Sequence, residues 1–444
     1  MTNVFVKKLT DKSTYKKQII RLQERLAKNS AEYRAEQENI PFYNIYFDAD
    51  NISTLLAETI KAEEYRTKPR PITTIKQEEK YRLISAPKLL DRIVQSAIST
   101  ALLEQKTEKF SENVYSYIPG RSSKKAILDC AKFIRQSLSS ANKQNLYLFR
   151  TDIKNYTDSI PLGPKSPVWS LLDNHLNKLD PDETLPAYYR NLVHDAAQPT
   201  YHTMEEKALF QNLTGLPMGS PLTNFIAILY LQKLDDALAS IPGVFYARYG
   251  DDIILLSKEA KIILTLYEKA KAILSELKLT MNTEKTGLFY LTFAARPCNN
   301  KNFQGCSQFD YLGASITAKG TVKLKTKHFR NLLISIKHRM NNNLSLLKDS
   351  PLEDRGKSTA EMLSTLFNKK NFLSDKKLIQ HTLLCSDRSQ LKQLDYFIAL
   401  HLAERLTGIR GVKAFRKISY KKMRAEWKLP SLCQLKNKKF MGFE

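Results

Sequence analysis

Two adjacent aspartates, Asp251 and Asp252, stand inside the apolar run "RYGDDIILL" (248–256), which the sequence predicts to be two strands joined by a tight turn. Ionised carboxylates are almost never buried unless a partner offsets the cost of burial. A third aspartate, Asp152, ends another apolar run at 146–153. Three carboxylates at the ends of neighbouring strands would form a hard, oxygen-only site suited to two Mg2+ ions, with Mn2+ as an alternative metal.

Such a site suits the transfer of a phosphoryl group. Two divalent ions roughly 3.5–4 Å apart clamp the attacking and leaving oxygens of an in-line displacement. One ion would activate the 3′-hydroxyl of a primer, and the other would neutralise the departing pyrophosphate. The plain alternative is that the adjacent aspartates are turn residues, because Asp is favoured where a chain reverses.

The elements that must position these residues alternate between strands and helices. Hydrophobic periodicity separates the two kinds of segment, and an apolar stripe from Phe329 to Leu344 marks one long helix near the C-terminal end. The sequence predicts strands over 81–87, 146–153, the two halves of 244–257 and 309–316, and helices over 89–105, 124–138, 224–239 and 258–278, with further helices in 1–70, in 162–214 and from 323 onward.

The charge of the chain indicates a polyanionic partner. Its 70 Lys and Arg exceed its 45 Asp and Glu by 25, while a hydrophobic content of 42% supports a packed core. Residues 321–444 hold 27 Lys and Arg against 10 Asp and Glu, so +17 of the net charge lies there. Nucleic acid is the leading candidate for the partner.

The cysteines, the histidines and the apolar segments indicate in which compartment the chain works. The five cysteines form no C-x2-C pair and the seven histidines have no metal-ligand spacing, which favours reduced thiols and disfavours a zinc site. The N-terminus lacks an apolar signal core and no apolar run reaches 18 residues. We therefore expect a cytoplasmic chain that has no membrane partner.

Taken in order, these segments resemble the reverse transcriptases, and in particular the bacterial branch that includes the group II intron, retron and defence-associated enzymes. The resemblance covers about residues 75–316 and most closely suggests the defence-associated members. The motifs that carry it are "RLISAPKLLDRIVQ" (82–95), "YSYIPGRS" (115–122), "TDIKNYTDSI" (151–160), "GLPMGSPLTNFIA" (215–227), "YARYGDDIILL" (246–256), "LKLTMNTEKT" (277–286) and "FDYLG" (309–313).

The resemblance implies a set of site residues. Asp152 and Asp251 should ligate both metals with the carbonyl of Ile153, and Asp252 should support them. Lys285 should protonate or stabilise the leaving pyrophosphate, although a solvated lysine is an equal alternative. The remaining expected residues are Arg82, which would grip the triphosphate, Gly215, Pro217, Gly219 and Ser220, which would lie under the nascent base pair, and Tyr311, Leu312 and Gly313, which would hold the primer end.

One position departs from the family pattern. Reverse transcriptases usually place an aromatic residue five positions after the first catalytic aspartate, where it blocks the ribose 2′-hydroxyl. Here that position is Thr157, and the aromatic Tyr156 precedes it. Both residues are expected near the nucleotide: either Tyr156 takes over the blocking role through a local shift, or the block is weaker than usual, and Thr157 could bond a 2′-hydroxyl.

The implied fold is an α+β right-hand polymerase with α-helical fingers and thumb around a palm that has a mainly antiparallel sheet. A basic helical extension would follow it. The expected organisation is an N-terminal helical extension (1–74), fingers (75–145), a palm (146–316) with a helical insert (162–214), the start of the thumb (317–350) and a basic thumb and RNA-binding extension (351–444).

The implied function is RNA-directed DNA polymerisation from dNTPs, in antiviral defence with a non-coding RNA. RNA template and DNA product are the expected partners, and a second reverse transcriptase or a second copy of this chain is a further candidate. Three alternatives stay open. They are template-independent or repeat-synthesising DNA synthesis, RNA-dependent RNA synthesis, and an RNA-binding scaffold that keeps a polymerase fold without catalysis.

Overall fold

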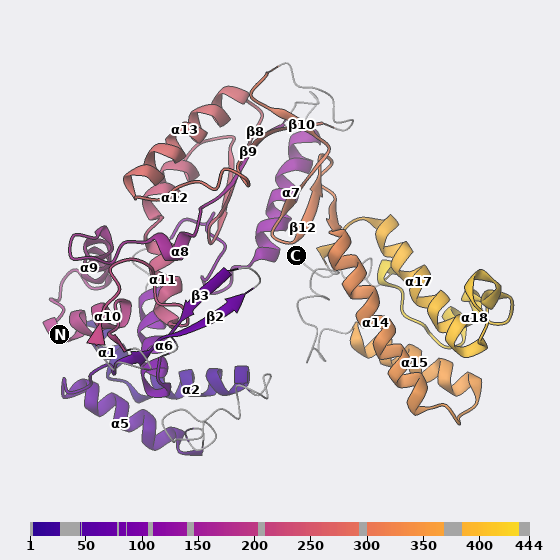
Figure 1. The fold of residues 1–444 in the computed structure, drawn as a ribbon, viewed down its shortest axis with the longest axis horizontal. Coiled ribbons are helices and arrows are strands. Elements are labelled where there is room, and N and C mark those ends of the chain that lie inside the picture. Colours follow the sequence, from indigo (N-terminus) through magenta and orange to yellow (C-terminus); the bar gives the residue numbers. More distant parts are fainter. Residues whose placement is uncertain are drawn as a thin grey trace. The chain divides into compact units, whose positions relative to one another are not determined.

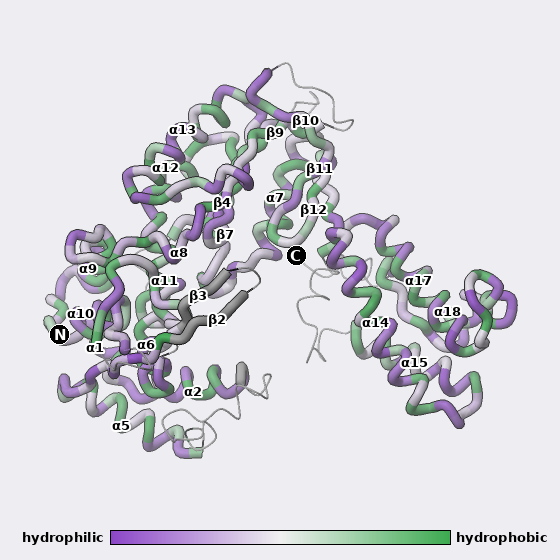
Figure 2. Tube along the Cα trace, viewed as in Figure 1, coloured by the Kyte–Doolittle hydropathy of each residue, from purple (hydrophilic) through white to green (hydrophobic). Residues whose placement is uncertain are grey.

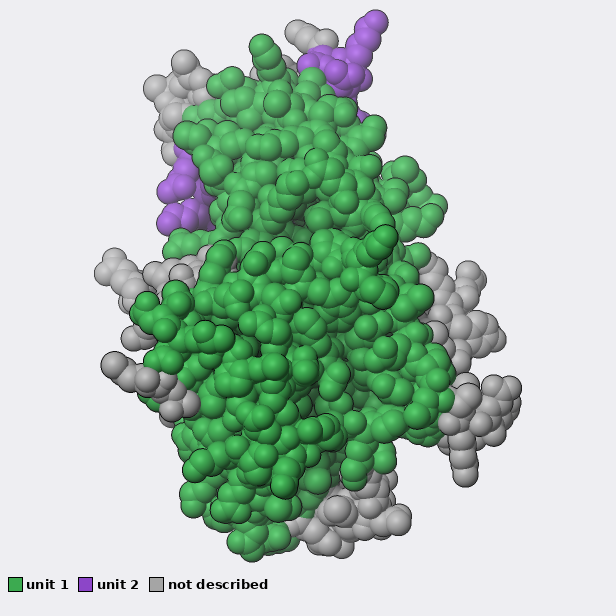
Figure 3. All heavy atoms as spheres, turned by 90° about the vertical axis from the view of Figure 1, so that its left-hand side faces the viewer, with its two compact units in different colours: residues 1–123, 147–288 green, residues 124–146, 289–444 purple. Residues whose placement is uncertain are grey.

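The computed structural model describes residues 3–26, 45, 47–77, 80–85, 87–104, 110–139, 146–202, 209–292, 300–367 and 384–434. Its contacts divide the chain into two compact units. Unit 1 consists of Met1–Ser123 and Tyr147–Leu288, and unit 2 of Lys124–Leu146 and Phe289–Glu444. Figure 1 traces the elements along the chain, and Figure 3 shows one face of unit 1.

Three antiparallel strands support the aspartates in unit 1. β8 (Asp252–Ser257) pairs with β4 (Leu146–Asp152) on one side and with β7 (Phe245–Tyr249) on the other. The buried apolar residues of β8 account for its central place, because a strand covered on both faces reads as a continuous apolar run. Two smaller sheets in unit 1 join β2 (Thr73–Gln77) to β3 (Lys80–Ile84), and β1 (Arg70–Pro71) to β5 (Tyr201–His202) and β6 (Leu209–Phe210).

Helices form the remainder of unit 1, and most of them carry one buried apolar face. Those predicted over 89–105 and 258–278 are confirmed as α6 and α13, and the segment 162–214 is helical through α9 and α10. The helices are α1 (Val4–Leu9), α2 (Lys12–Leu26), α5 (Ala49–Lys61), α6 (Leu89–Leu103), α8 (Tyr156–Ser159), α9 (Pro167–Leu179), α10 (Ala187–Ala197), α11 (Pro221–Leu229), α12 (Gln232–Ala239) and α13 (Ala260–Glu276).

The single helix predicted over 224–239 is wrong, because the segment forms two helices. α11 ends at Leu229 and α12 begins at Gln232. The Tyr230 hydroxyl donates a hydrogen bond to the Leu277 carbonyl, which anchors the chain where it changes direction. The start of α11 agrees with its sequence, since Ser220 caps it and Pro221 occupies the first turn.

Unit 2 begins with α7 (Ser123–Ser139) and continues with short strands. β9 (Gly287–Leu291) pairs in parallel with β10 (Gln304–Cys306). The strand predicted over 309–316 is instead a hairpin of β11 (Gln308–Tyr311) and β12 (Ala314–Thr317), and β12 also pairs with β13 (Val322–Leu324). Leu312 and Gly313 have φ of 47° and 86°, so they make the tight turn that the apolar letters concealed.

The rest of unit 2 is a helical body with its own core. α14 (Thr326–Leu346) confirms the predicted apolar stripe through its buried residues Leu332, Ile336, Met340 and Leu344. Hydrophobic and hydrophilic residues alternate along this helix in Figure 2. The other members are α15 (Leu352–Leu366), α17 (Arg388–Thr407), the 3-10 helix η2 (Gly411–Arg416) and α18 (Tyr420–Ala425).

The two units do not map one to one onto fingers, palm and thumb. α7 falls in the range expected for the fingers and groups with unit 2, so the predicted domain boundaries stay predictions. Among the helices that the structure describes, none is both long enough and apolar enough to cross a membrane.

Candidate active site

The β4–β8 pairing brings the predicted aspartates to one end of the central strands. Asp152 is the last residue of β4 and lies directly opposite Asp252, the first residue of β8. Asp251 occupies the turn between β7 and β8, and its carbonyl accepts a hydrogen bond from the Ile153 amide at 3.3 Å. The turn itself depends on Gly250, whose φ of 66° favours glycine.

Lys285 and Asn282 hold the carboxylate of Asp152 in place. The Lys285 Nζ lies 2.9 Å from Asp152 Oδ2, and Asn282 Nδ2 donates to Asp152 Oδ1 at 3.3 Å. The backbone N–H of Asn282 also donates to the Asp152 carbonyl at 2.7 Å. The segment that contains both residues is therefore fixed against the end of β4.

The protonation equilibria reflect a concentration of negative charge. Burial, followed by repulsion from Asp152, raises the pKa of Asp251 above its ordinary value. Burial and then Asp251 raise the pKa of Asp252 to about 6. The hydrogen bond to Asp152 raises the pKa of Lys285. A cation bound among these groups would relieve the repulsion that disfavours their ionised forms.

A pocket of about 650 Å³ opens beside the aspartates. Asp152 and Asp251 line it together with Lys285, while Asp252 is not among its lining residues. Asp252 is the first residue of β8, whereas Asp251 belongs to the turn before it. The pocket also takes in Tyr117, residues 152–158, Met218, Thr223, Asn224, Ala227, Gly250 and residues 282–285.

The donor chemistry of this pocket fits a hard divalent cation. Within the described part of the chain, no group of three or more His, Cys, Asp or Glu residues could hold a metal by side chains alone. Asp152, Ile153 and Asp251 all line the pocket, and the further carboxylates of Asp158 and Glu284 line it as well. Such a set of oxygen donors suits ions that take further oxygens from substrate phosphates and water.

Tyr156 and Thr157, which are expected near the sugar of the nucleotide, differ in how far their side chains are buried. Tyr156 is 5% exposed, and its hydroxyl donates to the Ala227 carbonyl at 2.5 Å. Thr157 is half-buried and lines the same pocket. Both residues line the pocket, but the Tyr156 hydroxyl is engaged with the protein interior, whereas Thr157 is the more exposed of the two.

The glycine-rich loop before α11 runs along the segment that follows Asp152. The Gly215 amide donates to the Ile160 carbonyl at 2.8 Å, and a Cβ at Gly215 would lie 3.3 Å from the Asp158 carbonyl oxygen. Gly219 has a φ of 97°, and the Pro217 carbonyl accepts a hydrogen bond from Thr223 at 2.6 Å. The expected Gly215 and Pro217 line a neighbouring pocket of about 280 Å³.

Ser220 serves the fold in a way that the sequence did not suggest. Its hydroxyl accepts from the Leu222 amide at 3.3 Å and donates to Gln95 at 2.9 Å. The side chain is 5% exposed. The contacts of Ser220 are therefore those of a helix cap tied to α6, and contact with a nucleotide stays a prediction.

Two further sets of expected residues are not brought to the pocket by the described contacts. Arg82 lies in β3, and its side chain is outside the described residues. Tyr311, Leu312 and Gly313 belong to the β11–β12 hairpin of unit 2. Their roles at the triphosphate and at the primer end stay predictions.

The structure adds residues that motif reasoning did not single out. Asn282 lies within "LKLTMNTEKT", and Tyr117 lies within "YSYIPGRS", but neither type at these positions signals a site by itself. Tyr117 is 49% exposed, lines the pocket and has a φ of 59°. A non-glycine residue in this region of φ is uncommon and draws attention to its position.

More than half of the chain matches a known protein family. Residues 74–316, more than half of the chain, match the profile described as "Reverse transcriptase (RNA-dependent DNA polymerase)". The helices, antiparallel strands and aspartates described above are those of an α+β right-hand polymerase fold. The chain belongs to the reverse transcriptase family, and the expectation of that family is confirmed.

Several solved structures resemble the chain distantly. Telomerase from Candida albicans, in complex with the TWJ fragment of telomeric RNA, is 12% identical with a TM-score of 0.46, over 84% of this chain and 66% of that one. Apo telomerase from Candida tropicalis is 13% identical with a TM-score of 0.45, over 81% and 68%. A form of the latter truncated from its C-terminal domain is 12% identical with a TM-score of 0.43, over 64% and 67%. The chain thus spans about two thirds of these proteins. No curated protein matches its sequence.

Proposed function

We propose that this reverse transcriptase extends a nucleic-acid 3′-hydroxyl with dNTPs on an RNA template. The observation that carries the proposal is the pocket where Asp152 and Asp251 meet Lys285, with Nζ 2.9 Å from Asp152 Oδ2. Carboxylates suit divalent cations, and a lysine ammonium suits a phosphate anion. Both kinds of group are needed to handle a nucleoside triphosphate.

The metal-binding residues in this proposal are Asp152, Asp251 and the carbonyl of Ile153, with Asp252 adding negative charge. Two Mg2+ ions, or Mn2+ in their place, would supply activation of the attacking hydroxyl and stabilisation of the leaving oxygen. The protein orients its own groups for this purpose, since Asn282 and Lys285 both hold the Asp152 carboxylate.

Lys285 is the proposed partner of the leaving group. Its side chain is 59% exposed, whereas that of Asp152 is 10% exposed, so the ammonium can move while the carboxylate stays in place. A cation bound at Asp152 would compete for that carboxylate and release Lys285 toward the departing pyrophosphate. Such a group contributes typically about 10²–10⁴-fold to the rate.

The first experiment supplies an RNA template with a DNA primer and offers dNTPs or NTPs separately. We expect Mg2+-dependent extension with dNTPs, and loss of extension in the double variant Asp251→Asn with Asp252→Asn. Glu268→Gln, an exposed carboxylate on α13, serves as the matched control. Extension that survives in the double variant would overturn the proposed site.

RNA-dependent RNA synthesis is the second candidate, favoured by one observation. Tyr156 is held by Ala227 and Thr157 borders the pocket, so the position that should exclude a 2′-hydroxyl carries a small polar side chain. The ratio of dNTP to NTP incorporation in wild type and in Thr157→Phe decides between the two. Incorporation of NTPs without dNTPs by the wild type would replace DNA synthesis with RNA synthesis.

Template use is decided by sequencing the product made with and without added RNA. A product complementary to the supplied RNA supports templated synthesis. A product of fixed composition without RNA indicates untemplated or repeat synthesis. If neither dNTPs nor NTPs are incorporated and a biological activity persists in the Asp251→Asn, Asp252→Asn variant, the chain acts as an RNA-binding scaffold.

For the biological setting we propose antiviral defence in the bacterial cytoplasm, with a dedicated non-coding RNA. The basic C-terminal region and the resemblance of the ordered motifs to defence-associated enzymes support this setting. RNA that co-purifies with the chain should be one defined species, and phage challenge should separate wild type from the Asp251→Asn, Asp252→Asn variant. A second reverse transcriptase or a second copy of the chain in the purified complex would identify the partner.

A further inference from the structure

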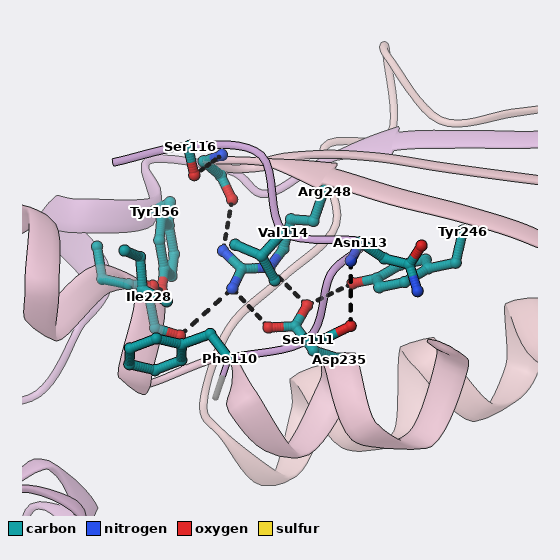
Figure 4. Close-up of polar contacts among 12 residues, drawn as sticks. Phe110, Ser111, Asn113, Val114, Ser116, Tyr156, Ile228, Asp235, Tyr246 and Arg248 are labelled. Atoms are coloured by element: carbon teal, nitrogen blue, oxygen red, sulfur yellow. Dashed lines mark hydrogen bonds and ion pairs between the residues drawn. The ribbon is translucent and has the colours of Figure 1, made fainter. Parts of the chain in front are cut away.

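A buried ion pair lies directly beneath the turn that carries Asp251. Arg248 donates from Nε to Asp235 Oδ1 at 2.7 Å and from Nη2 to Asp235 Oδ2 at 2.6 Å. The side chains are 0% and 2% exposed, and the Tyr246 hydroxyl also donates to Asp235 Oδ1 at 2.6 Å (Figure 4). A pair this deeply buried gains little net stability over apolar residues, so its presence calls for another reason.

The guanidinium also reaches the catalytic turn. Its Nη1 donates to the Gly250 carbonyl at 3.1 Å, and its Nη2 donates to the Ile228 carbonyl at 3.3 Å. On the opposite side of the same residue, the Gly250 amide donates to the Ser116 hydroxyl at 2.8 Å. Both backbone polar groups of Gly250 are thus bonded to side chains, the carbonyl to Arg248 of the same hairpin and the amide to the distant Ser116.

The backbone just before Ser116 is itself held by Arg248 of β7. The Tyr115 amide donates to the Arg248 carbonyl at 2.8 Å, and the Arg248 amide donates to the Asn113 carbonyl at 2.9 Å. The Arg121 guanidinium donates to the carbonyl of Val114 at 2.7 Å and to that of Phe110 at 3.2 Å. The "YSYIPGRS" loop is therefore a rigid support for the hydroxyl that meets Gly250.

We propose that Arg248 and Ser116 are positioning residues for catalysis, which set the orientation of Asp251 through the peptide groups of Gly250. This inference rests on the proposed polymerase function. When Asp152 and Asp251 are both ionised they repel each other, which favours displacement of the glycine-containing turn from β4, and glycine restricts the backbone of that turn little. Two hydrogen bonds to Gly250 oppose that displacement, so the carboxylates stay close enough to share divalent ions.

The decisive comparison is Ser116→Ala against Ser257→Ala. Both remove a buried hydroxyl that accepts a backbone amide, since Ser257 accepts from the Glu259 amide at 3.2 Å at the far end of β8. We expect kcat of Ser116→Ala to fall about tenfold with the KM for dNTP nearly unchanged, because a displacement of less than about 1 Å impairs chemistry rather than binding. The Mg2+ concentration for half-maximal activity should rise. Ser257→Ala should keep the wild-type kcat.

Conservative variants separate positioning from folding. Ser116→Thr keeps the hydroxyl and should restore kcat, whereas Ser116→Cys keeps the volume and accepts poorly, so it should behave like Ser116→Ala. Arg248→Lys keeps the charge but cannot bond Asp235 and Gly250 together. It should lower kcat and the Mg2+-induced rise in Tm more than Asp235→Asn, which leaves the Gly250 contact in place.

The outcomes distinguish failure of this inference from failure of the proposed function. If wild type extends primers and Ser116→Ala keeps its kcat and Mg2+ dependence, the positioning role is wrong. If wild type shows no extension, the proposed function fails, and the Mg2+-induced rise in Tm still tests the inference. Equal Mg2+ shifts for Ser116→Ala, Ser257→Ala and wild type would then overturn it.

Discussion

At the scale of single residues, the ion pair between Lys285 and Asp152 joins a mobile partner to a fixed one. Asp152 is held at both carboxylate oxygens and at its carbonyl, whereas the side chain of Lys285 is largely exposed. Such a pair is worth little to stability, since solvent screens the exposed partner. Its value is expected in the reaction.

Lys285→Gln should therefore lower kcat strongly and leave the fold intact. We expect a loss of about a hundredfold in kcat, the magnitude for removal of a general acid, with little change in Tm. Steady-state kinetics and a thermal melt measure both, with Lys261→Gln on the exposed face of α13 as the control. A lower Tm with an unchanged kcat would show that Lys285 stabilises the fold instead of contributing to catalysis.

The raised pKa values of Asp251 and Asp252 predict a link between pH, metal and stability. An acid whose pKa is higher in the folded state binds its proton more tightly there than in the unfolded chain. Without metal, the folded state thus loses stability as the pH rises from about 4 through about 6, where Asp252 ionises. Above that range a bound cation offsets the charge.

The Mg2+-induced rise in Tm should accordingly be larger at about pH 7.5 than at about pH 5. Thermal melts in chelator and in Mg2+ at both pH values measure the difference. The double variant Asp251→Asn with Asp252→Asn should abolish it. An equal Mg2+ effect at both pH values in wild type would contradict the coupling.

At the scale of elements, the sequence revealed features whose cause is local. Gly250 between two apolar runs identified the β7–β8 hairpin, whereas the start of α11 at Pro221 was predicted too late, at 224. The β11–β12 hairpin was missed because Leu312 is not a turn residue type. Contacts between distant segments carry no such local mark, as with Ser116 and Gly250, which are 134 residues apart.

Asp235 and Arg248 show the same limit. They are 13 residues apart, on α12 and on β7, and only the packing of that helix against that strand turns one toward the other. Ser220 was correctly placed in a loop before a helix, but its hydroxyl is occupied by Leu222 and Gln95. Motif spacing thus located the site, while the support beneath it required the folded structure.

Gly356 on α15 provides a test of packing in unit 2. A Cβ there would lie 2.7–2.8 Å from atoms of the Trp427 ring. Gly→Ala in a helix normally stabilises by about 1 kcal/mol, whereas overpacking costs about 1–3 kcal/mol. Because Trp427 is 3% exposed and has little room to move, Gly356→Ala should destabilise.

Urea unfolding of Gly356→Ala measures the sign of this effect, with Lys357→Ala on the exposed side of α15 as the control. The added variant Trp427→Leu should reduce the cost of Gly356→Ala if the ring is the obstacle. Stabilisation by Gly356→Ala alone would show that the helix propensity outweighs the contact.

At the scale of the whole molecule, positive charge and aromatic rings coincide in the C-terminal part of unit 2. Tyr396 is 42% exposed and Tyr420 is 40% exposed, and both line a pocket of about 650 Å³ with Phe415 and Lys392. The neighbouring exposed cations are Lys413, Arg416, Lys417 and Lys421. Aromatic faces beside cations suit unpaired bases of an RNA.

The double variant Tyr396→Ala with Tyr420→Ala should weaken RNA binding by about thirtyfold or more, since each of two stacked bases contributes about 1–3 kcal/mol. Leu346→Ala, at 84% exposure on α14, is the control for loss of an exposed apolar side chain. Changing Lys413, Arg416 and Lys417 to Gln should reduce the salt dependence of binding by up to about 0.7 per phosphate contact. If neither set of substitutions changes RNA binding, the RNA-binding site lies elsewhere in the chain.

The left-handed backbone conformation of Leu312 implies a trade-off between thermal stability and activity. Asparagine tolerates this conformation better than leucine, so Leu312→Asn should raise Tm by relieving strain of about 1 kcal/mol. Leu312 is half-buried at the tip of the hairpin although its residue type disfavours this backbone conformation. We therefore expect its side chain to make a contact that primer extension requires. Leu312→Asn should therefore have a higher Tm than wild type but extend primers poorly. Thermal melting measures the first effect, and the extension length per binding event measures the second.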